Sequence, residues 1–332
     1  MAGPVPGNRI PMLLMRHFLD LLDLAPEELQ SLIVEAGRLK ACQAAERTPT
    51  LLGRVLGLVF DKPSLRTRVS FQAAMAQVGG SSVFLSGSEA GLGSRESVPD
   101  FARVMSQYVD AVVLRTFSHA TVEAFAEHSA CPVINGLSDA YHPCQALADL
   151  FTMQEIFGDV RDLTVAFVGD GNNVARSLAI GCGKLGARFI LAAPPGYGFS
   201  DGFLALYRER VSATEPHQNG DPLHAVASAD IVYTDVWTSM GQEAERDERL
   251  QRFAGYQVNS RLMDAAPLHA RVMHCLPARR GEEVTGEVMD GDRSVIFQQA
   301  GNRLHAQKAL LEWLLDPQTQ KTDGAAAALR RK

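Results

Sequence analysis

The pentapeptide SLRTR, which begins at Ser64, is the part of the chain best suited to hold an anion. An apolar run over residues 55–60 precedes it and predicts a strand, while Pro63 prevents one helix from running through the junction. Ser64 is a favourable N-cap, and the free N–H groups at a helix start attract negative charge. Arg66 and Thr67 add donors that match phosphate oxygens. The segment therefore predicts a phosphate site, with an ordinary capped helix and solvated arginines as the alternative.

Further polar side chains follow other apolar runs. Arg115, Asp235 and Cys275 each stand just after a strand-like run, and His142 precedes a helical stretch. Each has an ordinary explanation when taken singly: an ion-pair partner, a helix cap, a small buried thiol and a satisfied core histidine. Together they bring a cation, a carboxylate, a thiol and an imidazole to the carboxyl ends of strands, where α/β proteins bind ligands. The pattern predicts a ligand site there.

Two series of strand-like runs alternate with helical stretches. They cover residues 55–60, 82–85, 111–114 and 132–134, and then 163–168, 189–193, 231–233 and 272–274. Continuous apolar strands separated by helices are typical of parallel sheets covered on both faces. We therefore expect an α/β fold with two similar, doubly wound lobes and an interdomain cleft.

Two helices should relate the lobes to each other. One is expected over residues 143–157, ended by Gly158, and leads into the second lobe. The other is expected from Arg303 to Leu315 and should pack back on the first lobe. These expectations divide the chain into a first domain of residues 1–150, joined by the helix at 303–316, and a second domain of residues 151–302.

The composition limits the classes of protein to consider. The chain has 332 residues, of which 46% are apolar, and a net charge of −6, which argues against general nucleic-acid binding. No apolar run is long enough for a membrane span or a signal peptide, so a cytoplasmic protein is expected. The five cysteines are scattered and indicate free thiols, with neither a disulfide framework nor a zinc site. The polar, Ala-rich tail over residues 317–332 is expected to be disordered.

A glycine-rich segment opens the second lobe. Gly169 and Gly171 follow a strand-like run, as in a dinucleotide-binding loop, but Val174 replaces the third glycine of that pattern. Asn172 and Asn173, at the start of the next helix, are better suited to bond a carboxylate or an amide than to admit a pyrophosphate. The segment therefore favours hydrogen bonding to a carboxylate or an amide over binding of a nicotinamide cofactor.

Taken together, these segments resemble the transcarbamylase family over residues 10–316. The SLRTR segment at Ser64 and the HPCQ segment at His142 resemble its two carbamoyl-phosphate signatures. Residues 235–242 (DVWTSMGQ), 274–277 (HCLP) and 302–305 (NRLH) resemble the ornithine branch of the family. The resemblance implies transfer of a carbamoyl group from carbamoyl phosphate to the δ-amine of L-ornithine, giving L-citrulline and phosphate in arginine biosynthesis. It also implies a homotrimer with active sites at subunit boundaries.

The resemblance also implies roles for individual residues. Those implied to contact carbamoyl phosphate are Ser64, Leu65, Arg66, Thr67, Arg115, His142, Gln145, Cys275, Leu276 and Arg303. Those implied to hold the α-amine and α-carboxylate of ornithine are Asn173, Asp235, Ser239 and Met240. The catalytic group consists of Arg115, His142, Asp235, Cys275 and Arg303. Because phosphate is already a good leaving group, positioning and electrostatics suffice without a metal, a cofactor or a covalent intermediate, and Cys275 is a substrate contact.

Four positions depart from the family pattern. Leu65 stands where threonine is commonest, and Gln72 and Gly301 stand where glutamate is usual. Gly91 stands where many relatives have a glutamine that reaches a neighbouring subunit's carbamoyl phosphate. Two alternatives remain open: a transcarbamylase for acetylornithine, putrescine or aspartate, and a non-catalytic relative that binds an anion.

Overall fold

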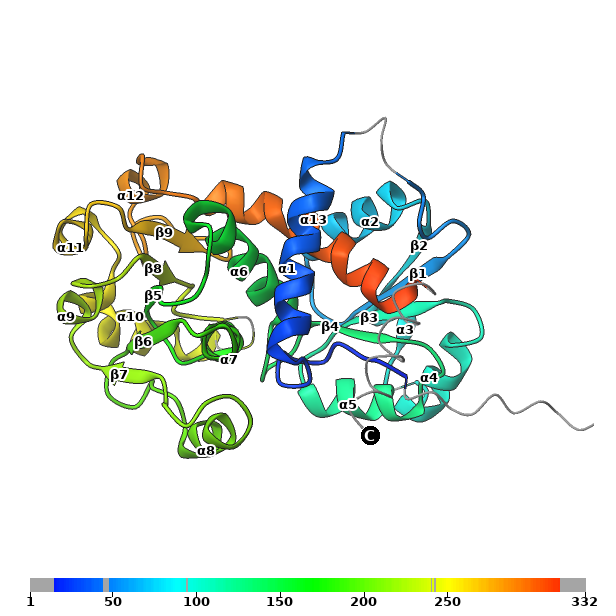
Figure 1. The fold of residues 1–332 in the computed structure, drawn as a ribbon. Coiled ribbons are helices and arrows are strands. Elements are labelled where there is room, and N and C mark those ends of the chain that lie inside the picture. Colours follow the sequence, from blue (N-terminus) through cyan, green and yellow to red (C-terminus); the bar gives the residue numbers. More distant parts are fainter. Residues whose placement is uncertain (1–14, 44–47, 94, 240, 242, 317–332) are drawn as a thin grey trace, which may run out of the picture.

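The strand-like runs form two parallel sheets in a computed structural model that describes residues 15–43, 48–93, 95–239, 241 and 243–316. The first sheet has the order β2-β1-β3-β4 and the second β7-β6-β5-β8-β9 (Figure 1). Their bounds are Val55–Phe60 (β1), Ser81–Ser86 (β2), Ala111–Arg115 (β3), Val133–Leu137 (β4), Thr164–Val168 (β5), Arg188–Ala192 (β6), His217–Asn219 (β7), Ile231–Thr234 (β8) and Arg271–His274 (β9). Neighbouring strands run parallel throughout both sheets, which confirms the predicted fold class.

Helices separate the strands and cover the sheets. Their bounds are Pro26–Ala41 (α1), Leu65–Gln77 (α2), Gly87–Ala90 (α3), Val98–Met105 (α4), His119–His128 (α5), Pro143–Phe157 (α6), Asn173–Leu185 (α7), Asp201–Arg210 (α8), Pro222–Val226 (α9), Arg246–Arg252 (α10), Ser260–Ala265 (α11), Gly286–Asp290 (α12) and Ile296–Leu315 (α13). α6 joins the lobes and α13 packs on α1, α2 and α6, as Figure 1 shows, which confirms that the last helix returns to the first lobe.

Alternate residues of the strands pack in different apolar clusters, because successive side chains of a strand point to opposite faces. In β1, Leu58 belongs to a cluster that also holds α1, α6 and α13, whereas Val59 packs with α4 and α5. In β5, Phe167 joins that same first cluster and Val168 joins a separate one. One face of each sheet therefore shares a continuous apolar core that runs from lobe to lobe.

The predicted anion-binding helix begins where its capping residue indicates. The Thr67 N–H donates to the Ser64 hydroxyl at 3.3 Å, and α2 follows directly. Phe71, Ala74 and Met75 are buried along one face of α2, at the helical spacing that the sequence shows. Local capping and periodicity thus account for the position of this helix.

Two elements differ from the sequence-based expectation. α13 begins at Ile296 and not at Arg303, because Gln299 and Asn302, which look like surface residues, are buried and hydrogen-bonded. Their amides donate to Asp149 and Thr152 of α6. The short strand β7 was not expected, since it is three residues long and has exposed polar side chains at the edge of its sheet.

The expected disordered tail, residues 317–332, lies outside the described residues. Within the described part of the chain, none of the helices combines the length and the apolar character that crossing a membrane requires.

Substitution of Gly91 should destabilise the protein more than substitution of Gly53. Both glycines have positive φ, 58° and 79°, which costs an L-residue about 1–2 kcal/mol. A Cβ atom at Gly91 would also lie 2.6 Å from the Cβ atom of Arg95, whereas one at Gly53 meets nothing within 4 Å. Urea unfolding of Gly91→Ala and of the matched control Gly53→Ala measures the difference. Equal losses of unfolding free energy would contradict a tight packing of Arg95 against Gly91.

Candidate active site

A cavity of about 940 Å³ opens at the carboxyl ends of both sheets and is lined by residues of both lobes. The predicted site residues that line it are Ser64, Leu65, Arg66, Thr67, Arg115, His142, Asn173, Asp235, Ser239, Cys275, Leu276 and Arg303. Gln145 lies beneath the cavity wall and is buried, so it does not face the cavity. Met240 lies outside the described residues.

Arg303 is the buried link between three helices at the floor of the cavity. Its guanidinium donates from Nη2 to the Thr67 hydroxyl at 2.7 Å and from Nη1 to Gln145 Oε1 at 3.0 Å. The side chain is 3% exposed, and its acceptors are a hydroxyl and an amide. Neither of these hydrogen bonds neutralises the positive charge.

Arg115 adds a second buried cation next to Arg303. It ends β3 and is 6% exposed, and burial together with repulsion from Arg303 and Arg66 lowers the pKa of Arg115 to about 10. The guanidinium therefore remains charged at neutral pH. Among the described residues, Nε of Arg115 and Nε of Arg303 have no hydrogen-bond partner, although both atoms are buried. Buried donors without acceptors are costly, so the floor of the cavity is built for an anion.

His142 lies in the same cationic surroundings. Burial lowers the pKa of His142 well below its ordinary value, and Arg303 and Arg115 lower it further. The imidazole is therefore neutral at physiological pH. A neutral ring can donate one hydrogen bond to a polarised oxygen without adding to the repulsion between the arginines.

Lys62 also lines the cavity, although no motif in the sequence marks it as a site residue. Its ammonium lies 4.3 Å from the centre of the Phe117 ring, and burial and the nearby Arg115 lower the pKa of Lys62. The one available signal was its position, two residues before the capping residue Ser64. Lys62 strengthens the positive charge of this wall.

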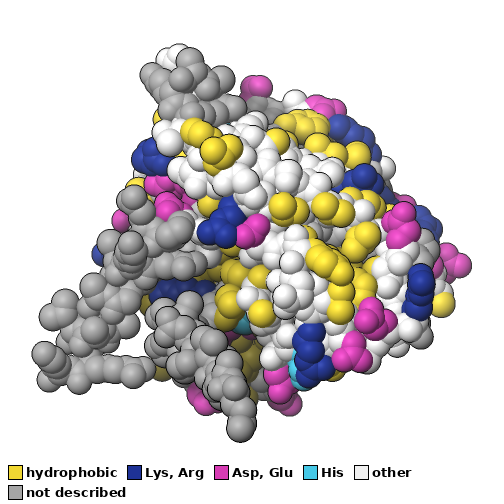
Figure 2. Space-filling view, turned by 90° about the vertical axis from the view of Figure 1, so that its right-hand side faces the viewer, with side chains coloured by type: hydrophobic (Ala, Val, Ile, Leu, Met, Phe, Trp, Pro, Cys, Tyr) yellow, Lys and Arg dark blue, Asp and Glu magenta, His cyan; other side chains and the backbone are white. Residues whose placement is uncertain are grey.

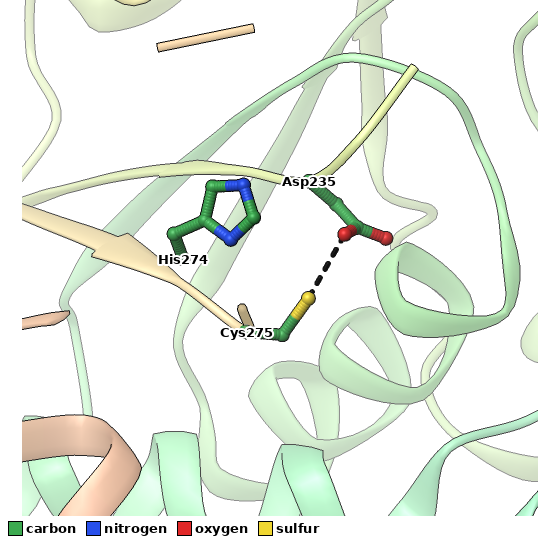
Figure 3. A group of neighbouring side chains, drawn as sticks. All are labelled: Asp235, His274 and Cys275. Atoms are coloured by element: carbon green, nitrogen blue, oxygen red, sulfur yellow. Dashed lines mark hydrogen bonds between the residues drawn. The ribbon is translucent and has the colours of Figure 1, made fainter. Parts of the chain in front are cut away.

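The other side of the cavity is built around Asp235, which follows β8. Its carboxylate accepts from the Asn172 amide at 2.9 Å and from the Val236 N–H at 2.8 Å. It also accepts from the Cys275 thiol at 2.9 Å, as Figure 3 shows. Burial and the neighbouring carboxylate raise the pKa of Cys275 well above its ordinary value. The sulfur is therefore a protonated donor, and a thiolate nucleophile is disfavoured.

The two asparagines at the start of α7 have different contacts. Asn172 caps the helix by accepting from the Val174 N–H, and its amide fixes Asp235, a role that the sequence analysis did not assign. Asn173 lines the cavity, but its amide donates to the Ser138 carbonyl of the first lobe at 2.7 Å. The second hydrogen of that amide nitrogen is still available to a ligand in the cavity.

Asp235, His274 and Cys275 lie close enough to raise the question of a metal. Their potential ligand atoms lie within 4.8 Å of one another (Figure 3). Both ring nitrogens of His274 are already engaged, however, with Glu283 at 3.0 Å and with the Leu276 N–H at 2.8 Å. A metal ion would have to break one of these buried hydrogen bonds, so the arrangement disfavours it.

Asp149 is a buried carboxylate in the middle of α6 that no motif in the sequence marks. It accepts from the Gln145 amide at 2.8 Å, from the Gln299 amide at 2.7 Å and from the Tyr233 hydroxyl at 3.0 Å. Burial raises the pKa of Asp149 to about 6, although these three donors oppose the shift. Because a carboxylate only accepts, it turns the Gln145 nitrogen toward itself and the Gln145 oxygen toward Arg303.

Two parallel α/β lobes enclose a cavity lined by buried arginines and a carboxylate, which is the architecture of an α/β enzyme with its ligand site at the carboxyl ends of the strands. The chain belongs to the aspartate/ornithine carbamoyltransferase family. The family's carbamoyl-P binding domain matches residues 16–155, and its Asp/Orn binding domain matches residues 161–314.

Individual relatives are similar over almost their whole length. The chain is 50% identical to ornithine carbamoyltransferase of Bacillus subtilis over 302 residues, which is 90% of this chain and 94% of the relative. It is 50% identical to that of Methanopyrus kandleri over 311 residues, or 92% and 99% of the two chains. The solved structure of ornithine carbamoyltransferase from Pyrococcus furiosus is 45% identical with a TM-score of 0.87, covering 91% of this chain and 97% of that one.

Replacement of Arg115 by methionine should abolish most phosphate binding without destabilising the free protein. The change removes a desolvated charge that Arg303 and Arg66 repel, and it keeps the buried stem. Loss of a charged hydrogen bond of about 1.5–3 kcal/mol predicts a roughly 10- to 150-fold weaker affinity for inorganic phosphate. Calorimetry and melting curves with and without phosphate measure both quantities. Arg103→Met, at an exposed arginine of α4, is the matched control; unchanged phosphate affinity in Arg115→Met would exclude Arg115 from the anion site.

Proposed function

We propose that this protein transfers the carbamoyl group of carbamoyl phosphate to the δ-amine of L-ornithine, giving L-citrulline and phosphate. The observation that carries the proposal is the pairing, in one cavity, of the buried cations Arg115 and Arg303 with the carboxylate of Asp235. The two cations suit a phosphorylated carbonyl compound, and the carboxylate of Asp235 suits a substrate with an α-amine. Relatives about 50% identical over nine-tenths of the chain carry the name ornithine carbamoyltransferase.

The N-terminus of α2 holds the phosphate in this proposal. Ser64, Arg66 and Thr67 supply side-chain donors, and Leu65 supplies a backbone N–H that its altered side chain does not affect. Arg115, at the end of β3, donates to a phosphate oxygen as well as to the carbamoyl oxygen. Gln72 and Gly301 also differ from the usual residue, but neither lines the cavity. The departures at these positions therefore leave the phosphate site intact.

The carbamoyl group lies over the buried cations. Arg115 and the neutral ring of His142 donate to the carbamoyl oxygen and stabilise the negative charge that develops on it. The Leu276 carbonyl accepts from the carbamoyl nitrogen. Gln145 acts through Arg303, because its oxygen already accepts from that guanidinium and its side chain does not reach the cavity.

Ornithine binds at the second lobe. Asp235 accepts from the α-amine, while Asn173, Ser239 and Met240 complete the recognition of the two α-substituents. The neutral δ-amine then forms a bond to the carbamoyl carbon, the bond from that carbon to the phosphate oxygen breaks, and the amine proton leaves with phosphate. Cys275 keeps its proton and orients Asp235 through their hydrogen bond.

The alternatives fit the site less well. N-acetylornithine and putrescine each lack a free α-amine or an α-carboxylate, and would leave buried polar groups of the second lobe unpaired. A purely anion-binding relative has no use for the Asp235 network. We also propose that residues 1–150 with the helix at 303–316 bind carbamoyl phosphate and that residues 151–302 bind ornithine. This division falls inside α13, since the helix begins at Ile296.

We further propose a homotrimer that works in the cytoplasm in arginine biosynthesis. β2 is an edge strand of the first sheet, and Val83 on β2 and Val69 on the neighbouring α2 are 49% and 53% exposed. Figure 2 views the first lobe from the side away from the second lobe and shows hydrophobic side chains gathered over it. An apolar surface next to an open sheet edge suits a subunit contact. The five free thiols support a reducing compartment.

Citrulline formation is the direct test of the proposed function. With carbamoyl phosphate present, we expect kcat/KM for L-ornithine to exceed that for N-acetylornithine or putrescine by about 5- to 150-fold, since each unpaired buried polar group costs about 1–3 kcal/mol. A colorimetric assay for ureido products measures all three reactions. Comparable rates with putrescine would overturn the assignment to ornithine, and absence of any ureido product would overturn the assignment as a transferase.

Disruption of the apolar edge of the first lobe should dissociate the trimer and lower activity together. We expect Val83→Glu to shift the sedimenting species from trimer toward monomer, because a buried unpaired carboxylate opposes association. Leu268→Glu is the matched control, since Leu268 is 90% exposed on the second lobe. Analytical ultracentrifugation at assay concentration measures the species. A fully active wild-type monomer would refute the shared active site.

A further inference from the structure

We propose that the buried pair of His274 and Glu283 is a positioning device that holds the backbone of Leu276 at the cavity. The inference rests on the proposed function, in which the Leu276 carbonyl accepts from the carbamoyl nitrogen. His274 lies at the end of β9, and Glu283 lies in the loop that follows it. Neither His274 nor Glu283 lines the cavity, so neither is a direct substrate contact.

The first link joins the His274 ring to Leu276. The Leu276 N–H donates to Nδ1 of His274 at 2.8 Å. Leu276 has a φ of 57°, in the left-handed region that side chains disfavour, and it lines the cavity. A backbone held in a disfavoured conformation beside a substrate needs a fixed partner, and the ring supplies one.

The second link fixes the ring itself. Because Nδ1 accepts a hydrogen bond, the proton of the neutral ring lies on Nε2, which donates to Glu283 Oε1 at 3.0 Å. The same Glu283 oxygen accepts from the Arg279 N–H at 2.6 Å. Glu283 therefore fixes the His274 ring, which bonds the Leu276 N–H. It also fixes Arg279, three residues after Leu276 in the same turn.

The third link connects this pair to the rest of the site. The backbone N–H of His274 donates to the Gln299 oxygen at 2.9 Å, and the Gln299 nitrogen donates to Asp149. Both side chains of the pair are completely buried. The ring therefore has a single well-determined place from which it can orient Leu276.

The contacts also show which property of Glu283 matters. Its Oε1 atom accepts both hydrogen bonds, while its buried Oε2 atom has no partner among the described residues. A glutamine can keep both bonds through its single oxygen. The positioning role thus requires an acceptor in this place and does not require the negative charge.

Two substitutions of His274 separate the two ring nitrogens. The amide oxygen of His274→Asn can take the place of Nδ1 and keep the bond from Leu276, whereas the amide nitrogen of His274→Gln can take the place of Nε2 and keep only the bond to Glu283. We expect His274→Gln to lose ~100-fold in kcat, the scale for misplacing a reacting group. His274→Asn should retain more of the wild-type kcat. The inhibition constant of inorganic phosphate should not change in either variant, because α2 holds the phosphate.

Direct binding gives a second measurement that does not depend on ornithine turnover. Calorimetry measures the affinity for carbamoyl phosphate relative to the affinity for inorganic phosphate. This ratio should be lower in His274→Gln than in the wild type and unchanged in His274→Asn. Glu283→Gln should match the wild type in kcat and in this ratio, whereas Glu283→Met should resemble His274→Gln. Melting temperatures of all variants report any general loss of stability.

The outcomes separate positioning from a merely structural role. Equal losses of kcat in the two His274 variants, or parallel losses of phosphate and carbamoyl-phosphate affinity, would overturn the inference. A wild-type protein that forms no citrulline would overturn the proposed function, while the ratio of affinities would still decide whether His274 controls the carbamoyl contact.

Discussion

The structure depends on two guanidinium groups buried without carboxylate partners. Burial lowers the pKa of both Arg115 and Arg303, repulsion from Arg303 lowers that of Arg115 further, and within the described part of the chain no salt bridge neutralises either of them. Such an arrangement is unfavourable in the free protein and becomes favourable when an anion arrives. The free protein is therefore less stable than one with uncharged residues at the floor of the cavity, and binding of an anion restores that stability.

The fold supplies a rigid frame that tolerates this repulsion. α13 returns from the second lobe to the first, so that Arg303 meets Thr67 on α2 and Gln145 on α6. A continuous apolar core packs these helices against both sheets. The cations cannot move apart without disturbing that core. The carboxylate of Asp149 is linked to Arg303 through Gln145, which donates to Asp149 and accepts from Arg303.

Gln299 joins the two halves of the site. Its nitrogen donates to Asp149, which orients Gln145 and through it Arg303, while its oxygen accepts from the backbone of His274. The Gln299 amide on α13 therefore connects the arginines of the proposed phosphate site with the turn that contains Leu276. This arrangement explains why α13 is long and starts in the second lobe although most of it packs on the first.

The sequence by itself determined the local features of this protein. The cap at Ser64, the bounds of α6 and the strands that carry Arg115, Asp235 and Cys275 at their ends follow from capping, periodicity and apolar runs, which depend on neighbouring residues. Because parallel strands end at the same edge of a sheet, the sequence also predicted that the polar residues after these strands lie in one site. Tertiary structure alone decided the start of α13, the choice of Asn172 as the partner of Asp235, and the roles of Asp149, Lys62, His274 and Glu283. Asp149, His274 and Glu283 are buried polar side chains whose hydrogen-bond partners local sequence patterns do not identify. Lys62 is buried against the Phe117 ring, which lies in another loop.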